Sequence, residues 1–283
     1  MAGPIGLLGG LEHFEPTLPL DRRILDQVGV FAPEVVILPL ASLPWQAKAA
    51  GALAQEQWTR LGAHARVVSL LDARSQEAVA EADVIVLPGG VPNRLVTALQ
   101  GTPILDEIVN RWRDGAAVTG SSAGAIAMFE RRLNLYPPNP FRLIPGFGLL
   151  RGHIVAPHFA RLRVAHWYRP FLALMEGLAV IGLDESTGLV GRDGSLQVLG
   201  AGSVTIASTS GVEVYPTGST LELDLTVPAL HSLPGESSPP PGLRPDSPHR
   251  SLRSLGGETP IPSSSRSSSP PLQPAGAGSS LRW

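Results

Sequence analysis

The 283-residue sequence contains no cysteine, and this absence excludes disulfide bonds, thiolate metal ligands and a cysteine nucleophile. No apolar run approaches the roughly 20 residues that span a bilayer, so no membrane partner is expected. No basic residue precedes the first apolar stretch, which argues against a secretory signal and predicts a cytoplasmic protein. The formal net charge of -2 gives no general attraction for nucleic acid.

Signatures of cofactor and metal binding are also missing. The glycine pair Gly9-Gly10, after the first apolar run, is not part of a G-x-G-x-x-G dinucleotide fingerprint. There is no H-E-x-x-H motif, and the histidines are scattered along the chain. We therefore expect neither a cofactor nor a metal ion.

The composition divides the chain into two parts. Hydrophobic residues make up 43% and charged residues 16% of the whole, a balance that allows a sizeable core. From His231 to Trp283, however, Ser, Pro and Gly supply 31 of 53 residues, and few large apolar side chains remain. We predict a folded body, residues 1–230, and a disordered tail, residues 231–283. The tail is interpreted as a spacer; because its net charge is +2, a tether for an anionic partner is the alternative.

Short apolar runs alternate with longer amphipathic runs in the body. The apolar runs are rich in Val, Ile and Leu, are typical of buried parallel strands, and lie at 4–8, 34–40, 65–71, 83–87 and 116–119. Helical patterns lie at 44–61, 75–82, 92–100 and 104–113. This alternation predicts an α/β fold, a three-layer sandwich around a mostly parallel sheet. Short strands at 188–190, 195–199, 203–207, 212–215 and 221–225 predict antiparallel hairpins near the C-terminal edge of that sheet.

The strongest chemical signal is Gly120-Ser121-Ser122-Ala123-Gly124, which follows a buried strand and precedes a helix-compatible run. This is the context of a nucleophile elbow, in which a tight turn leaves no room for side chains two positions either side of the serine. The helix N-terminus adds free N–H groups that favour an oxyanion. We predict Ser122 as the nucleophile and Ser121 as a support for the turn. The alternative is an anion-binding loop without chemistry.

A serine nucleophile needs a base. The body contains five histidines: His13, His64, His153, His158 and His166. His13 and His64 are expected on the surface. His158 follows an apparent strand at 152–156, and ligands in an open parallel sheet bind outside such strand ends. We therefore predict His158 as the base, with His166 in reserve.

The base needs a carboxylate that orients it. Glu130, the only acid between Ser122 and His158, would lie eight residues along the elbow helix, about 12 Å away, and is discounted. Asp184 and Glu185 close another apolar strand. Adjacent strand residues point to opposite faces, so only one of the two reaches the histidine, and the residues alone leave this choice open. The order Ser, His, acid disfavours an α/β-hydrolase, which runs Ser, acid, His.

The oxyanion hole needs two N–H donors. The amide of Ala123 is one candidate. The other comes from Gly89 or Gly90, which end the neighbouring strand and, lacking side chains, let the backbone approach a substrate.

These motifs together resemble the peptidase E and cyanophycinase family of serine peptidases over roughly residues 4–225. The resembling segments are Leu87-Pro88-Gly89-Gly90, Thr102-Pro103-Ile104-Leu105, Gly120 to Ala125, Gly146 to Leu150, Pro157-His158-Phe159 and Gly182 to Thr187. The resemblance implies a class I glutamine amidotransferase-like fold with a serine in place of the cysteine. It implies Ser122 as nucleophile, His158 as base and, as in the cyanophycinase branch, Glu185 as the triad acid.

The resemblance also implies a small peptide substrate with an aspartyl or isoaspartyl residue at the cleaved bond. The family often has a Gln after the glycine pair, where this chain has Val91-Pro92-Asn93-Arg94. Guanidinium groups pair with carboxylates in bidentate fashion, so Arg94, Arg161 and Arg163 are candidate substrate-binding residues. Gly89 and Asn93, in and after the glycine pair, complete the candidate set.

We expect a serine exopeptidase or dipeptidase. The alternatives are a non-catalytic binding or regulatory protein with the same fold, and an amidotransferase-like domain, which normally needs a cysteine. A homodimer is left open by the sequence.

Overall fold

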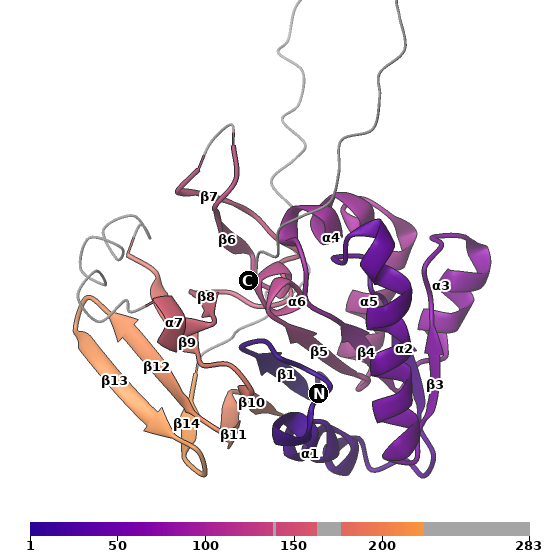
Figure 1. Cartoon of the computed structure of the whole chain (residues 1–283), viewed down its shortest axis with the longest axis horizontal. Coiled ribbons are helices and arrows are strands. Elements are labelled where there is room, and N and C mark those ends of the chain that lie inside the picture. The colour runs from indigo at the N-terminus through magenta and orange to yellow at the C-terminus, as the bar shows by residue number, and fades with distance from the viewer. Residues whose placement is uncertain (138–139, 163–176, 224–283) are drawn as a thin grey trace, which may run out of the picture. The chain divides into compact units, whose positions relative to one another are not determined.

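The computed structural model describes residues 1–137, 140–162 and 177–223 (Figure 1). The tail predicted at 231–283, and with it the boundary at residue 230, lies outside these ranges, as do Arg163 and His166. No helix within the described ranges combines the length and the hydrophobicity that crossing a membrane requires.

Eight strands within the described ranges form a central sheet in the order β14-β11-β10-β1-β5-β4-β2-β3. Their bounds are Ile5–Leu8 (β1), Glu34–Ile37 (β2), His64–Val67 (β3), Val84–Leu87 (β4), Ala117–Ser121 (β5), Thr187–Arg192 (β10), Ser195–Gly200 (β11) and Thr220–Glu222 (β14). Strands β1 to β5 are mutually parallel, while β10, β11 and β14 continue the sheet in antiparallel fashion beyond β1. The mostly parallel sheet with antiparallel hairpins at one edge agrees with the prediction.

Helices cover both faces of this sheet (Figure 1). Their bounds are Leu18–Val28 (α1), Pro44–Arg60 (α2), Ala73–Ala80 (α3), Pro92–Leu99 (α4), Pro103–Arg113 (α5) and Ala123–Met128 (α6), and a 3-10 turn, η1, spans Glu15–Thr17. Successive strand residues alternate between faces: Leu7 packs with the core under α3 to α6, and Leu8 with Ile24 and Trp58 under α1 and α2. These two cores make the fold a three-layer α/β sandwich.

A second sheet was not anticipated. Its order is β13-β12-β9-β8, with bounds His153–Pro157 (β8), Ala179–Leu183 (β9), Ser203–Ser208 (β12) and Gly211–Pro216 (β13). The strands expected at 203–207 and 212–215 therefore form a hairpin of this sheet and not of the central one. A hairpin pattern specifies its own turn but not the sheet that it joins, which explains the difference.

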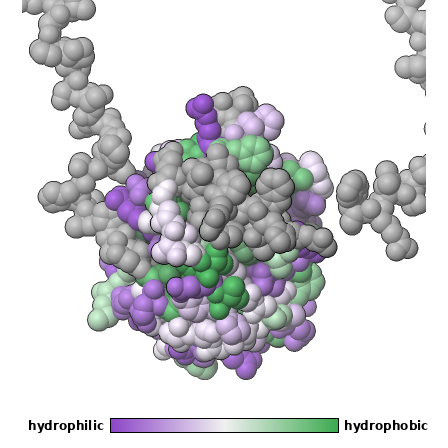
Figure 2. All heavy atoms as spheres, turned by 90° about the vertical axis from the view of Figure 1, so that its left-hand side faces the viewer, coloured by the Kyte–Doolittle hydropathy of each residue, from purple (hydrophilic) through white to green (hydrophobic). Residues whose placement is uncertain are grey.

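The second sheet is partly open to solvent. Figure 2 views the side on which β12 and β13 lie, where hydrophobic and hydrophilic residues mix at the surface. The outward valines of edge strand β13, Val212 and Val214, are 41% and 61% exposed. The remaining elements among the described residues are the hairpin of β6 (Arg131–Asn134) with β7 (Arg142–Pro145), and the short helix α7 (Phe159–Leu162) after β8.

Candidate active site

Ser122 lies in the turn between β5 and α6 with φ 46° and ψ -104°, a backbone conformation that residues with a side chain seldom adopt. A Cβ on Gly120 would lie 2.5 Å from the carbonyl carbon of Gly124, and a Cβ on Gly124 would lie 1.9 Å from the carbonyl oxygen of Leu87. Both positions therefore require glycine, for the steric reason inferred from the sequence. The turn presents the serine side chain at the carboxyl end of β5, as an elbow does.

Ser122, His158 and Glu185 form one hydrogen-bonded chain. The Oγ of Ser122 lies 3.0 Å from Nε2 of His158, and Nδ1 of His158 lies 2.8 Å from Oε1 of Glu185. His158 follows β8 and Glu185 follows β9, and these strands are parallel neighbours whose carboxyl ends meet. The tautomer that satisfies both bonds has its proton on Nδ1, which leaves Nε2 free to accept from the serine hydroxyl.

The glycine pair after β1, Gly9-Gly10, packs against His158 and binds its backbone. The carbonyl of Gly9 accepts from the amide of His158 at 3.0 Å, and the carbonyl of Gly10 accepts from the amide of Ser186 at 2.9 Å. A Cβ on Gly10 would lie 2.3 Å from Cε1 of the His158 ring. The sequence excluded a dinucleotide fingerprint at this pair and assigned it no role in the site. In the structure it joins β1 to the two loops that carry His158 and Glu185.

The two adjacent acids after β9 point to different partners. Glu185 reaches His158 with one oxygen, and its other oxygen, Oε2, lies 2.8 Å from Nε of Arg161. Asp184 instead accepts from the amide and the hydroxyl of Ser203, at 3.0 and 2.8 Å, and so anchors β12. Of the two acids between which the sequence left the choice open, Glu185 contacts the histidine and Asp184 contacts Ser203.

The other acid and histidines lie elsewhere. Helix α6 ends at Met128, and Glu130 pairs with Arg151 at 3.5 Å, half exposed. His64 pairs with Glu34 on the surface, as expected. His13 does not lie free on the surface: both its ring nitrogens are buried without a hydrogen-bond partner within the described residues, and burial lowers its pKa despite the opposing charge of Glu12.

The two candidate oxyanion donors are free. The amides of Gly90 and Ala123 have no hydrogen-bond acceptor in the part of the chain that the structure describes. The amide of Gly89 is occupied, because it donates to Oε1 of Glu12 at 2.7 Å. Of the two glycines that the sequence proposed, Gly90 is therefore the one with an available N–H.

Glu12 was missed by sequence reasoning. Its second oxygen accepts from the hydroxyl of Ser121 at 2.7 Å, so one carboxylate joins the loops after β4 and β5. Ser121 thus supports the turn, as expected, through a partner that was not anticipated. The only local signal is an acid two residues after Gly10, and acids are common in such loops.

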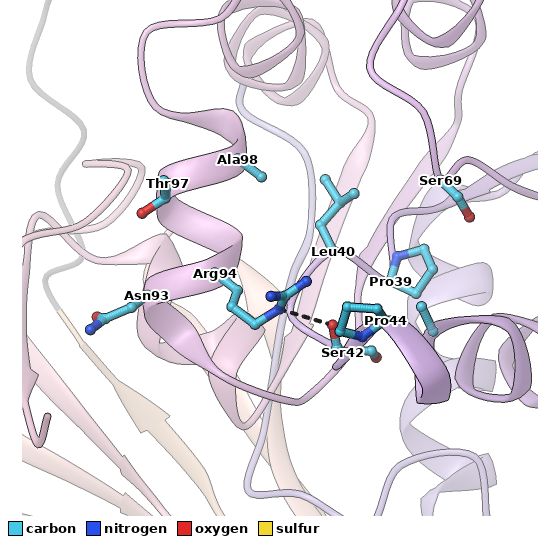
Figure 3. A pocket seen from close by; sticks show the side chains of 10 residues that line it. Pro39, Leu40, Ser42, Pro44, Ser69, Asn93, Arg94, Thr97 and Ala98 are labelled. Atoms are coloured by element: carbon cyan, nitrogen blue, oxygen red, sulfur yellow. Dashed lines mark hydrogen bonds between the residues drawn. The ribbon is translucent and has the colours of Figure 1, made fainter. Parts of the chain in front are cut away.

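A cavity of about 550 Å³ opens beside the site at the ends of β2 and β3 (Figure 3). It is lined by Pro39, Leu40, Ser42, Pro44, Ala47, Ser69, Asn93, Arg94, Thr97 and Ala98, and by none of the hydrogen-bonded chain of Ser122. The side chain of Arg94 extends from α4 toward Ser42, whose carbonyl accepts from its Nε at 3.1 Å (Figure 3). The cavity is therefore a neighbouring feature and not the place of the nucleophile.

Asn93 and Arg161, both predicted to bind substrate, are engaged within the protein. The Oδ1 of Asn93 accepts from Nη1 of Arg132 at 2.6 Å, and Arg161 pairs with Glu185. Arg132 is 5% exposed, and burial lowers the pKa of its guanidinium. No carboxylate pairs with Arg94 or Arg132 within the described residues. In the same ranges, no three His, Asp or Glu residues are arranged to hold a metal ion.

A serine at an elbow, a histidine and a carboxylate in one chain define a candidate hydrolase site on an α/β sandwich. The model of peptidase family S51 matches residues 6–199, more than half of the sequence, so the chain belongs to this family. It is a serine peptidase by class.

Named relatives agree with this class. Cyanophycinases from Trichormus variabilis and Nostoc sp. are each 31% identical over 218 residues, covering 71% of this chain and 72% of theirs. A crystal structure of a peptidase from an acI-B1 Actinobacterium has a TM-score of 0.69 at 23% identity, covering 79% of this chain and 98% of that one. A protein described as peptidase E from Listeria monocytogenes EGD-e has a TM-score of 0.53 at 13% identity, covering 71% and 100%. Because both identities are below 25%, the likeness to these two structures shows a shared fold and nothing about function.

Proposed function

We propose that this peptidase cleaves small peptides with a Ser122-His158-Glu185 triad. The observation that carries the proposal is the unbroken chain of contacts from Oγ of Ser122 through His158 to Glu185. His158 accepts the serine proton at Nε2 as Oγ attacks the carbonyl carbon, and then delivers it to the leaving amine. A water molecule then gives a proton to His158 and attacks the acyl carbon. The ester bond to Oγ breaks, the proton returns to Ser122, and the acyl group leaves as a carboxylic acid. Glu185 holds the imidazole tautomer and stabilises the imidazolium.

The developing oxyanion is stabilised by the amides of Gly90 and Ala123. Donors that are already aimed at the position of the negative charge need no reorganisation in the transition state. The free state of both N–H groups supports this role.

The substrate carries an acidic residue, aspartyl or isoaspartyl, at the cleaved bond, and the enzyme acts as an exopeptidase or dipeptidase. Support comes from the charges close in sequence to the oxyanion turn: Arg94 follows Gly90 by four residues, and Arg132 contacts its neighbour Asn93. A guanidinium without a carboxylate partner is suited to bind one from a ligand. Arg161 does not serve this purpose, because Glu185 occupies it.

The first test is labelling with a fluorophosphonate probe, followed by intact mass and peptide mapping. We expect one adduct on Ser122 and none on Ser122→Ala or His158→Ala, with all three proteins sharing the wild-type melting temperature. The absence of an adduct on folded wild-type protein would contradict the triad and favour a non-catalytic binding protein.

The second test addresses the substrate. Asp-X and β-Asp-X dipeptides are compared with Asn-X and Ala-X under identical conditions. One charge-assisted hydrogen bond contributes about 1.5–3 kcal/mol, so kcat/KM should favour the acidic peptides by about tenfold or more. Equal kcat/KM for Asp-X and Ala-X would remove the acidic specificity and leave the peptidase activity untouched.

A further inference from the structure

Glu12 connects two loops that carry the candidate oxyanion donors. Its Oε1 accepts from the amide of Gly89 and its Oε2 from the hydroxyl of Ser121, both at 2.7 Å. A carboxylate that accepts two hydrogen bonds at this length is firmly held, because bonds to a charged acceptor are shorter and stronger than neutral ones. Glu12 follows β1, so the contact also joins a third strand end to the other two.

Each donor amide directly follows a group that is fixed in place. In the turn after β4, Gly89 is held by Glu12, and the amide of Val91 donates to the carbonyl of Ala41 at 2.8 Å. The N–H of Gly90, between them, has no acceptor in the described ranges. A Cβ on Gly89 would lie 2.8 Å from Oε1 of Glu12, so glycine at this position lets the carboxylate approach.

The elbow repeats this arrangement. Ser121 is held by Glu12, and the amide of Ser122 donates to the carbonyl of Leu8 at 2.9 Å. The next amide, that of Ala123, again lacks an acceptor within the described residues. One carboxylate therefore links the two turns that carry these free amides.

The backbone around Glu12 is held in an unusual conformation. Leu11 and His13, on either side of it, have φ of 56° and 66°. Residues with a Cβ rarely populate this region, and they remain there only when the surrounding structure requires it. Of the eight non-glycine residues with positive φ in the described ranges, Ser122, His158 and Ser186 also belong to the site. The segment of Glu12 thus shares positive φ with Ser122 and His158, two of the three residues of the proposed triad.

We propose that Glu12 is a positioning residue for the oxyanion hole: by bridging Gly89 and Ser121, it holds the Gly90 and Ala123 amides at the separation that the transition state requires. This inference rests on the proposed function, since it assumes attack by Ser122. A purely structural role for Glu12 would affect stability or binding, whereas the positioning role affects the rate of the chemical step.

The experiment measures saturation kinetics of the fluorophosphonate probe on the full chain, because the phosphonyl oxygen enters the oxyanion hole as Ser122 is modified. For Glu12→Ala, we expect the maximal inactivation rate to fall about 100-fold, the loss typical of one oxyanion donor. The probe concentration at half-maximal rate should stay within twofold, and the melting temperature close to that of wild type. Glu12→Gln keeps an acceptor for Gly89 and should recover to within about tenfold of the wild-type rate. The matched control is Glu15→Ala, an exposed acid of the same segment paired with Arg60, which should react as wild type does.

The outcomes separate the two proposals. If wild-type protein is labelled and Glu12→Ala is labelled at the same maximal rate, the positioning role is wrong and the triad stands. If wild-type protein is not labelled, both proposals fall. If Glu12→Ala does not fold, Ser121→Ala, which removes one of the two contacts, decides in its place: a loss of about tenfold in maximal rate supports the positioning role, and an unchanged rate overturns it.

Discussion

Two groups of strand ends at the same edge of the central sheet differ in how the backbone is built. At β1, β4 and β5, glycine pairs, positive-φ residues and hydrogen bonds between loops surround Ser122. At β2 and β3, prolines and alanines line an open cavity of about 550 Å³, and none of its lining residues has positive φ. The region that holds the cavity is therefore the one without these backbone conformations. The candidate triad lies where the backbone adopts costly conformations, whereas the cavity is lined by residues with ordinary φ and contains one guanidinium, that of Arg94.

The largest loss of activity within the strained region is expected at Glu185. Glu185→Gln should lower kcat by about 100-fold or more. The neutral amide does not stabilise the imidazolium, and its NH2 group can favour the tautomer without a proton on Nδ1 of His158. Asp184→Asn, one residue away, should lower kcat less than tenfold, since Asp184 contacts Ser203 and not the histidine. Steady-state kinetics of both variants on one cleaved dipeptide checks this. The reverse order would transfer the acid role to Asp184.

Gly10 tests whether the packing of the glycine pair against His158 matters to the chemistry. Gly10→Ala should lower kcat by about 100-fold, because the new Cβ would occupy space taken by the imidazole, 2.3 Å from Cε1. Gly62→Ala is the matched control, with positive φ and no atom within 4 Å of its added Cβ. It should cost about 1 kcal/mol of stability and leave kcat unchanged. Equal kcat in the two variants would show that backbone strain alone explains Gly10.

Removing the guanidinium of Arg94, which lines the cavity, should lower activity less than the changes above and only for acidic peptides. Arg94→Ala should lower kcat/KM for Asp-X by about 10-fold to 100-fold, while kcat/KM for Ala-X changes less than threefold. The maximal rate of fluorophosphonate labelling should stay at the wild-type value, because Arg94 does not touch the triad. Arg22→Ala, an exposed arginine of α1, serves as the control. A uniform loss for all dipeptides would assign Arg94 to the structure of the loop after β2.

Removing the charge of Asp21, a buried residue of α1 that belongs to neither region, should have the smallest effect on turnover. Its effect on stability should be clear. Burial raises its pKa to about 7, with the charge of Glu12 adding to the effect and the hydrogen bond from Gln57 opposing it. An acid whose pKa is raised on folding stabilises the protein least when it is ionised. Stability should therefore decline as pH rises from about 4 to about 7.

Asp21→Asn keeps an acceptor for Gln57 and removes the ionisation. At pH 8 it should raise the free energy of unfolding by up to about 4 kcal/mol, and the slope between pH 4 and pH 7 should become shallower. Urea unfolding at several pH values measures both. The control is Asp26→Asn, on the exposed side of α1, which should retain the wild-type slope. A slope unchanged in Asp21→Asn would assign the pH dependence to another group.

The elbow was predictable because its signals are local. Strand, Gly-x-Ser-x-Gly and helix follow one another within 12 residues, so the conformation of Ser122 is encoded where it occurs. The parallel strands were predictable for a similar reason, because short unbroken apolar runs are typical of strands that are buried on both faces of a sheet. Helix α1 was missed although Pro19 in its first turn and Gly29 at its end, with φ 69°, are ordinary boundary signals.

What escaped prediction depends on distant partners. Glu12 is separated from Gly89 by 77 residues and from Ser121 by 109. No feature of the sequence near Glu12 indicates that it contacts either residue. The choice between Asp184 and Glu185 depends on which of the two side chains after β9 is directed toward His158 after β8, and alternation alone leaves this undecided. Likewise, β12 pairs with β9 and not with β11, a preference that its short hairpin pattern does not contain.

The central place of β1 has a consequence for the order of events during synthesis. This strand precedes all others, yet its two edges stay unpaired until β5 and then β10 are made, about 110 and 180 residues later. Ser122 leaves the ribosome before His158 and well before Glu185, so the nascent chain holds a serine that nothing activates. Because the reactive geometry depends on these late, long-range pairings, it forms only as the sheet closes. The proposed triad is therefore complete only after Glu185 and the last strands of the sheet have been made.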